Sequence, residues 1–332
     1  MTTYNAHFEG QSAGTSVTPA NSGTYGDSPT LNVYAINSVV AYSSGTSAHG
    51  TGAVGLTVNS GAATANPSLL YGSVSTGTFG TRCYFNFGSL PSVDARIIAI
   101  KNATQITNGS GDMGGVNLKT NGTIEVTDTT GASLNKSSSA TQFITTGAWY
   151  RFENLWNIST TAGWYKAAVY TGDSTTPWYS YTSAVNLNSG STNIAGVAVG
   201  KSSLSGTFSG TWYVDDVTAF DNNTAFAGPY VPGGPSISTS VTGAYTKLDA
   251  TGSSPVNGGA LSYSISPSTG SYQVSPGIFM VPQTTSPGSV TLTVTEAGGN
   301  SSSTAVAIPA LTTAASSQTT VMVQRYVGGS WQ

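Results

Sequence analysis

The fold of this chain is decided by one ten-residue stretch, Trp149-Tyr150-Arg151-Phe152-Glu153-Asn154-Leu155-Trp156-Asn157-Ile158. Tyr150, Phe152, Trp156 and Ile158 share one face of this stretch, whereas Arg151, Glu153 and Asn157 fall on the other. Successive side chains of a β-strand point to opposite faces. The alternation therefore predicts a strand with one buried face and one wetter face, which is typical of an antiparallel sheet in a sandwich.

This strand opens a longer segment, residues 149–221, which holds five of the six tryptophans and the one adjacent pair of carboxylates, Asp215-Asp216. Elsewhere, short runs of aromatic and β-branched residues are separated by Gly, Asn, Ser and Pro, which indicates an all-β protein. We expect on the order of ten or more strands before residue 222, spaced as in β-sandwiches. Between two of them, Asn121-Gly122 predicts a hairpin with a type I′ turn.

The composition excludes several classes of protein. Charged residues make up only 7% of the chain, but 38% hydrophobic and 10% aromatic residues argue against disorder. The net charge of −3 gives no basic patch for nucleic acid or an anionic membrane. No run approaches the roughly 18 apolar residues of a membrane span. The first residues lack the basic and apolar regions of a signal peptide.

Cys83 is the only cysteine, so neither an intramolecular disulfide nor a cysteine-based metal site can form. It lies within an expected strand, where a buried and inert thiol is the simplest interpretation. A lone free thiol also suggests folding in a reducing cytosol.

The clearest boundary is the segment Ala227-Gly228-Pro229-Tyr230-Val231-Pro232-Gly233-Gly234-Pro235, whose three prolines and three glycines stop any regular element. We therefore predict a first domain over residues 1–228, a linker over 229–235 and a second domain over 236–309. Six or seven short strands in the second domain suit a small immunoglobulin-like sandwich. Residues 310–332 form a C-terminal linker and a terminal strand, which without a hairpin partner would pair with another chain.

Several motifs resemble a known family. They are Trp149-Tyr150-Arg151-Phe152-Glu153, Lys166-Ala167-Ala168-Val169-Tyr170 followed by Gly172-Asp173-Ser174, Val214-Asp215-Asp216-Val217 and the opening Phe8-Glu9-Gly10. Together they resemble the concanavalin A-like (laminin G-like) jelly-roll domain, most closely in structural proteins of tailed bacteriophages of actinobacteria. A second set resembles a PKD-type immunoglobulin-like domain: Lys247-Leu248-Asp249-Ala250-Thr251-Gly252, Leu261-Ser262-Tyr263 and Val290-Thr291-Leu292-Thr293-Val294. The resemblance implies an all-β fold, a jelly-roll sandwich followed by a small immunoglobulin-like sandwich and a strand-like tail.

Catalysis must be considered, because the jelly-roll superfamily includes β-glucanases with a Glu-x-Asp-x-x-Glu strand. The nearest match, Glu125-Val126-Thr127-Asp128-Thr129-Thr130, lacks the second glutamate. Adjacent Asp215 and Asp216 would point to opposite faces of a regular strand, which prevents a catalytic dyad. His7 and His49 are too few and too poorly placed for a triad or a histidine metal site. We therefore predict that the chain is not an enzyme.

The sequence offers candidate residues for two ligands, calcium and a sugar. Domains of this kind often hold calcium, and Asp215 and Asp216, with Asp112 and Asp173, are the candidate ligands; alternatively, an aspartate of the pair accepts hydrogen bonds from backbone donors at a strand end. No other cofactor is expected.

A sugar would stack on exposed aromatic rings beside a carboxylate, which points to Trp178, Tyr179 and Tyr181 with Asp173. The alternative is that these rings pack in the core or between subunits.

The resemblance implies a non-enzymatic virion structural protein, a capsid decoration or minor tail protein at the particle surface, assembled in the host cytoplasm. Its partners would be other virion proteins, as capsid or tail subunits or a homo-oligomer, held by β-edges and apolar contacts. The alternative function is a lectin-like adhesin that binds host cell-wall glycan through exposed aromatics.

Overall fold

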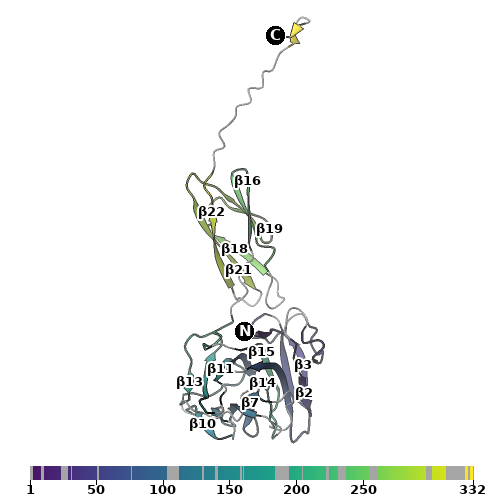
Figure 1. Cartoon of the computed structure of the whole chain (residues 1–332). Coiled ribbons are helices and arrows are strands. Elements are labelled where there is room, and N and C mark those ends of the chain that lie inside the picture. Colours follow the sequence, from purple (N-terminus) through teal and green to yellow (C-terminus); the bar gives the residue numbers. More distant parts are fainter. Residues whose placement is uncertain are drawn as a thin grey trace. The chain divides into compact units, whose positions relative to one another are not determined.

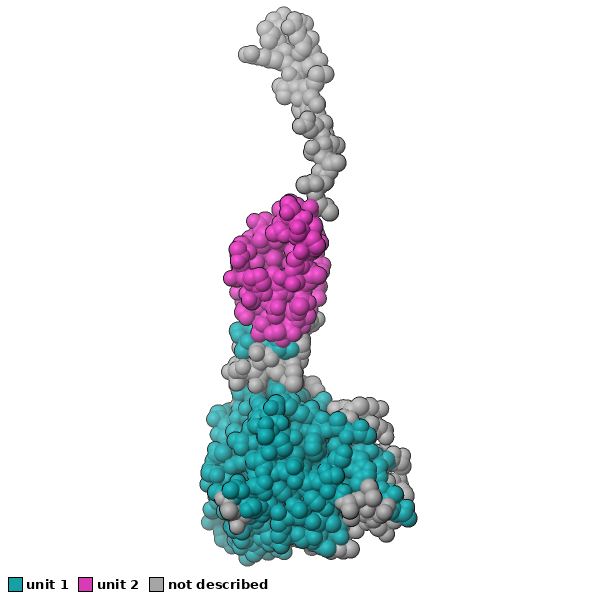
Figure 2. Space-filling view, turned by 90° about the vertical axis from the view of Figure 1, so that its left-hand side faces the viewer, with its two compact units in different colours: residues 1–234, 254–262, 294–302 teal, residues 235–253, 263–293, 303–332 magenta. Residues whose placement is uncertain are grey.

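The computed structural model describes residues 3–8, 11–23, 29–30, 32–50, 52–75, 77–102, 112–128, 131–138, 141–157, 159, 161–183, 194–203, 205–221, 224–230, 237–253, 261–296, 301–311, 326–327 and 330–331. Strands are the only regular elements in this part of the chain (Figure 1). Figure 2 colours two compact units: unit 1 comprises residues 1–234, 254–262 and 294–302, and unit 2 comprises residues 235–253, 263–293 and 303–332. Within the described ranges no helix is long and apolar enough to cross a membrane.

Unit 1 contains two large antiparallel sheets. The first sheet runs in the order β13 (Tyr179–Thr182), β12 (Trp164–Thr171), β11 (Trp149–Asn157), β6 (Thr78–Phe87), β15 (Thr211–Asp221), β4 (Gly52–Val58) and β3 (Ser38–Ser44), with β1 (Thr3–Ala6) paired to β15. The second sheet runs in the order β10 (Ser133–Lys136), β9 (Ile124–Thr127), β8 (Asp112–Leu118), β7 (Ala95–Lys101), β14 (Ile194–Gly200), β5 (Asn66–Ser75) and β2 (Asn32–Ile36). The predicted all-β fold class and jelly-roll sandwich are confirmed.

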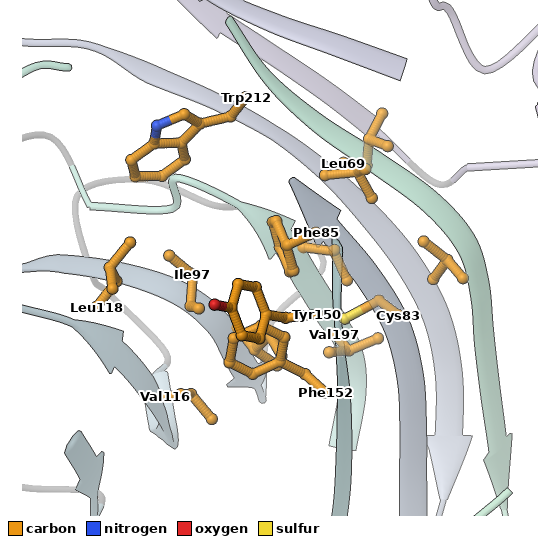
Figure 3. Packing of buried hydrophobic residues seen from close by; sticks show 14 of the residues in the cluster. Leu69, Cys83, Phe85, Ile97, Val116, Leu118, Tyr150, Phe152, Val197 and Trp212 are labelled. Carbon is orange, nitrogen blue, oxygen red and sulfur yellow. The ribbon is translucent and has the colours of Figure 1, made fainter. Parts of the chain in front are cut away.

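The core lies between these two sheets, because one face of each strand is apolar. Phe152 of β11 packs edge-on against Phe85 and Phe87 of β6, with ring centroids 5.6 and 6.2 Å apart. From the second sheet, Ile97 and Val197 meet the same cluster (Figure 3). The alternation in the sequence therefore predicted the inner face of β11 correctly.

Cys83 is also fully buried in this cluster, as predicted, and burial raises the pKa of its thiol. A thiol that stays protonated in an apolar core is a poor nucleophile, so the side chain has a packing role.

The hairpin predicted at Asn121-Gly122 joins β8 to β9, with Leu118 opposite Ile124. Of the two residues, Gly122 alone has a positive φ, of 83°. The backbone N–H of Gly122 donates to the carbonyl of Lys119, and the N–H of Lys119 donates to the carbonyl of Thr123. The hairpin is therefore confirmed, but its loop is longer than a two-residue type I′ turn.

Seven strands between Ser238 and Ile308 form two smaller sheets. One has the order β16 (Ser238–Thr242), β17 (Tyr245–Asp249), β20 (Ile278–Pro282) and β19 (Tyr272–Ser275); the other has the order β18 (Leu261–Ser266), β21 (Gly288–Glu296) and β22 (Ser301–Ile308). This strand number is the predicted one, but the PKD-type assignment and the domain boundaries stay predictions. Residues 231–236, most of the proposed linker, lie outside the described residues.

The C-terminal tail differs from its prediction. Of the expected terminal strand, residues 321–325 lie outside the described ranges. The described part, β23 (Tyr326–Val327), pairs with β24 (Ser330–Trp331) in a hairpin. The prediction of a terminal strand without a hairpin partner is therefore wrong, because Tyr326 and Val327 pair with Trp331 and Ser330 of the same chain.

Replacement of Phe152 by alanine tests the packing of the core. Phe152 is 1% exposed, so we expect the F152A substitution to lower the free energy of unfolding by about 3–5 kcal/mol. Urea denaturation measures this change. The matched control is Val39→Ala on β3, where the side chain is 45% exposed, and the cost there should stay within about 0.5 kcal/mol. Similar losses in the two variants would contradict the assigned core.

Candidate functional site

The candidate site begins at an irregularity in β15. The pairing of β15 with β6 shifts register between Asp215 and Thr218, and Asp216 has a φ of +43°. An extra residue of this kind breaks the alternation of a strand. Both carboxylates consequently reach the same residue, His49. The prediction that Asp215 and Asp216 point to opposite faces is wrong, because it assumed a regular strand.

Asp215 binds backbone donors. Its Oδ2 accepts hydrogen bonds from the N–H groups of Ala48 (2.8 Å) and His49 (3.2 Å), and its Oδ1 accepts one from the N–H of Asp216 (2.8 Å). Burial and the neighbouring Asp216 raise the pKa of Asp215 well above its usual range, despite these three bonds. Asp215 therefore fastens the loop that contains Ala48 and His49 to β15.

His49 is held on both ring nitrogens. Its Nδ1 pairs with Oδ2 of Asp216, and its Nε2 lies 2.9 Å from Oδ2 of Asp173. The ring stacks on Tyr230 and meets Tyr84 edge-on, each with centroids 4.7 Å apart. Burial would lower the pKa of His49, but the hydrogen bonds and charges of Asp173 and Asp216 outweigh it and raise the pKa to about 9. His49 is therefore an imidazolium at neutral pH.

Asp173 links this cluster to solvent. Its side chain is 43% exposed, whereas those of His49 and Asp216 are 4% and 0% exposed. The hydroxyl of Tyr84 donates to Asp173 Oδ1 at 2.6 Å and accepts the N–H of Tyr230 at 2.9 Å. Burial opposes ionisation of Asp173, but His49 and Tyr84 hold its pKa below the usual range. The exposed carboxylate is therefore charged and fixed in position.

A buried ion pair supports the same surface. Arg151 donates to Glu153 Oε1 at 2.6 Å and to the carbonyls of Gly172 and Ser174 at 3.1 and 2.9 Å. Glu153 Oε2 accepts the N–H of Gly228 at 2.9 Å. Both charged side chains are almost fully buried, so the prediction of a wetter face is wrong at Arg151 and Glu153. Arg151 thereby holds the 172–174 turn, and Glu153 holds the backbone at Gly228.

Beside this cluster lies a hollow of about 530 Å3. Its walls are formed by Ser44, Gly45, Thr46, Ser47, Gly50, Asn86, Gly147 and Trp149. Trp149 is half-buried, and Asn86 lies opposite it on β6. The amide nitrogen of Asn86, a largely buried residue, donates to the carbonyl of Gly147 at 3.1 Å, which fixes the amide. The loop 44–50, fastened by Asp215 and His49, forms one wall.

The lining suits a neutral, hydroxyl-rich ligand. An indole face packs against the C–H face of a sugar ring, and amide, hydroxyl and backbone groups bind its hydroxyls. None of the wall residues that the structure describes is charged. The hollow therefore offers stacking and hydrogen bonding without a group that would pair with an ionic ligand.

The aromatic residues predicted to bind sugar lie elsewhere. Tyr179 is 3% exposed in the core and donates its hydroxyl to Asn135, while Trp178 and Tyr181 are partly buried against the same core. Trp178 meets the core residue Tyr150 edge-on. Asp173, by contrast, belongs to the His49 cluster. The contacts of the three aromatic residues agree with the packing alternative, and their role in sugar binding stays a prediction.

The aspartates predicted to bind calcium do not form an evident site. No group of three or more His, Cys, Asp or Glu residues in the described ranges could hold a metal ion. A cation at Asp216 would face the imidazolium of His49, and the oxygens of Asp215 already accept three N–H groups. Asp112 pairs instead with Lys101 and Arg96. As arranged here, the residues do not fit calcium, although Asp216 Oδ1 has no hydrogen-bond partner among the described residues.

No protein-family model matches the chain, and no curated protein matches it. Solved structures do match. Lectin II from Ulex europaeus is 12% identical over 66% of this chain and 97% of the lectin, with a TM-score of 0.41. The VIP36 exoplasmic/lumenal domain in a Ca2+/Man-bound form is 10% identical over 65% and 92% of the two chains, with a TM-score of 0.40. At these values the likeness concerns the lectin-type jelly-roll fold alone.

The matches also include enzymes. A GH131 β-glucanase catalytic domain from Podospora anserina is 9% identical over 66% of this chain and 94% of that domain, with a TM-score of 0.37. A Trypanosoma rangeli sialidase is 10% identical over 57% and 30% of the two chains, with a TM-score of 0.30. These matches contradict the prediction that the chain is not an enzyme, because catalytic proteins share the fold. They do not establish an activity for it.

None of the four structures named above is that of a virion protein. The predicted phage origin, virion surface location and capsid or tail partners therefore gain no support from them and stay predictions.

The pH dependence of folding tests the state of His49. Because its pKa is raised from 6.5 to about 9 by folding, its contribution is complete below pH 6.5. As the pH rises towards 9, the unfolded chain releases this proton first and stability falls, by on the order of 3 kcal/mol. Urea denaturation of the native protein and of the His49→Gln variant measures the difference in the pH dependence of the free energy of unfolding. This comparison separates the effect of His49 from that of Lys201, whose pKa of about 8 falls in the same pH range. Parallel pH profiles would contradict the assignment.

Proposed function

We propose that unit 1 binds a neutral carbohydrate in the hollow of Trp149 and Asn86. One observation carries this proposal: a half-buried tryptophan lies opposite a largely buried, oriented amide in a hollow walled by serine, threonine and glycine. The hollow, at about 530 Å3, lies within the range of small-ligand sites.

The binding mode follows from the groups that line the hollow. The sugar ring would lie against the indole of Trp149, which supplies apolar contact without a charge. The amide of Asn86 and the hydroxyls of Ser44 and Thr46 would bind its hydroxyl groups. Because these walls are held by the bonds of Asp215 and His49, little ordering would accompany binding, which favours affinity.

This proposal favours the lectin-like alternative over the virion structural role. It moves the site from Trp178, Tyr179 and Tyr181 to Trp149. The lectin-type structures named above are consistent with glycan recognition, but at their level of similarity they carry no part of the argument. The source of the glycan, including a host cell wall, remains part of the proposal.

Replacement of Trp149 tests the proposal. On an array of neutral and acidic oligosaccharides, we expect the native protein to retain neutral glycans. The Trp149→Ala variant should bind the best of them at least about tenfold more weakly in titration calorimetry, because it loses the stacking surface.

The matched control is Trp164→Ala. Trp164 is also half-buried and pairs with Asn157 at the opposite end of β11, where Lys166 lies over its ring. This variant should bind as the native protein does. Loss of binding in Trp178→Ala but not in Trp149→Ala would favour the Trp178 site, and absence of any glycan binding would exclude both.

A further inference from the structure

The strand β16 presents a bare sheet edge. It ends the four-stranded sheet, pairs only with β17 among the described strands, and all five of its residues are exposed. Its sequence, Ser238-Thr239-Ser240-Val241-Thr242, has neither a charge nor a proline. Val241 is 59% exposed. These are the features of an edge that accepts a further strand.

The hairpin to β17 determines which backbone groups face outward. Thr242 is opposite Tyr245, and two residues, Gly243 and Ala244, form the turn. In a two-residue hairpin the closing pair is hydrogen-bonded, and bonded pairs then alternate along the strands. The N–H and C=O groups of Thr239 and Val241 therefore point away from β17, towards the free edge.

Three other edge strands of the described chain, β19, β10 and β3, are protected. On the opposite edge of the same sheet, β19 shifts register between Gln273 and Ser275. In unit 1, β10 also has a register shift and ends at Lys136. The edge of β3 is covered, because the backbone of residues 14–17 bonds to Val40 and Tyr42. Bulges, lysines and covering segments are the usual means of blocking edge pairing.

We propose that β16 pairs with β16 of a second copy of this chain in an antiparallel, twofold-symmetric contact. With Ser240 opposite its symmetry mate, Thr239 of one copy faces Val241 of the other. The outward N–H and C=O groups of these two residues then bond reciprocally. The side chain of Val241 lies on the sheet face that also carries Thr246 and Leu248. In the dimer, the second copy covers it there.

The distribution of charges around β16 allows a second copy of the chain to be the partner. No charged residue lies in the facing strands, so a copy meets no like charge at the contact. The nearest cation, Lys247, is one strand further from the axis and opposite Ser240. The two symmetry-related lysines would thus be separated by about three strand spacings, roughly 14 Å, which exceeds the Debye length at physiological salt. The contact is short and therefore weak. It does not depend on carbohydrate binding.

Sedimentation velocity of the full chain tests this pairing. Between about 5 and about 500 µM, the weight-average sedimentation coefficient of the native protein should rise from that of a monomer towards that of a dimer. Val241→Pro removes one outward N–H, a change that an edge strand tolerates, and should remain monomeric. Val241→Thr keeps that N–H and should still associate.

Two lysine substitutions, one on β16 and one on β19, give a second measurement. Val241→Lys places two lysines near each other in the dimer and should be monomeric. Val274→Lys on β19, where the native side chain is 60% exposed, should associate as the native protein does. Circular dichroism melts check that each variant is folded. A native protein that stays monomeric, a V241K variant that still dimerises, or dissociation by V274K would each overturn the proposal.

Discussion

The candidate site depends on one irregularity, the extra residue that β15 carries against β6 at Asp215 and Asp216. The positive φ of Asp216 costs on the order of 1 kcal/mol in a residue with a side chain. It is offset by the hydrogen bonds that Asp215 accepts from Ala48, His49 and Asp216 and by the pairing of Asp216 with His49. Without this bulge, one carboxylate would point into the apolar core, and the loop 44–50 would lose its attachment to the first sheet.

A layer of buried polar groups covers the outer face of the first sheet. Arg151 and Glu153 bond the 172–174 turn and Gly228, while Tyr84 and His49 orient Asp173. A buried ion pair adds little net stability, but loss of one partner costs about 3–5 kcal/mol because the other is left uncompensated. Such groups therefore restrict the loops to one arrangement. The Trp149 hollow lies beside them, so its walls are fixed before a ligand arrives.

Much of the sandwich could be predicted, because the two-residue period of a strand is local information. It placed Phe152 and Tyr150 in the core. The same period would also put Trp149 on the face of Arg151, a signal, not used above, that this tryptophan lies outside the core. The His49 cluster could not be found this way. His49 and Asp216 are 167 residues apart, and no residue pattern marked the bulge that joins them. The aromatic residues around Trp178 gave no sign of their burial, because alternation in that stretch does not reveal which rings the core covers.

The buried carboxyl group of Asp215 holds the loop 44–50 in place, and amide hydrogen exchange measures this most directly. The N–H groups of Ala48 and His49 should exchange as slowly as those of core strands in the native protein, because they bond to a buried acceptor. In the Asp215→Ala variant, both should exchange much faster while core amides, such as that of Phe85, keep their protection. Rapid exchange of Ala48 and His49 in the native protein, at the rate of an exposed loop, would contradict the account.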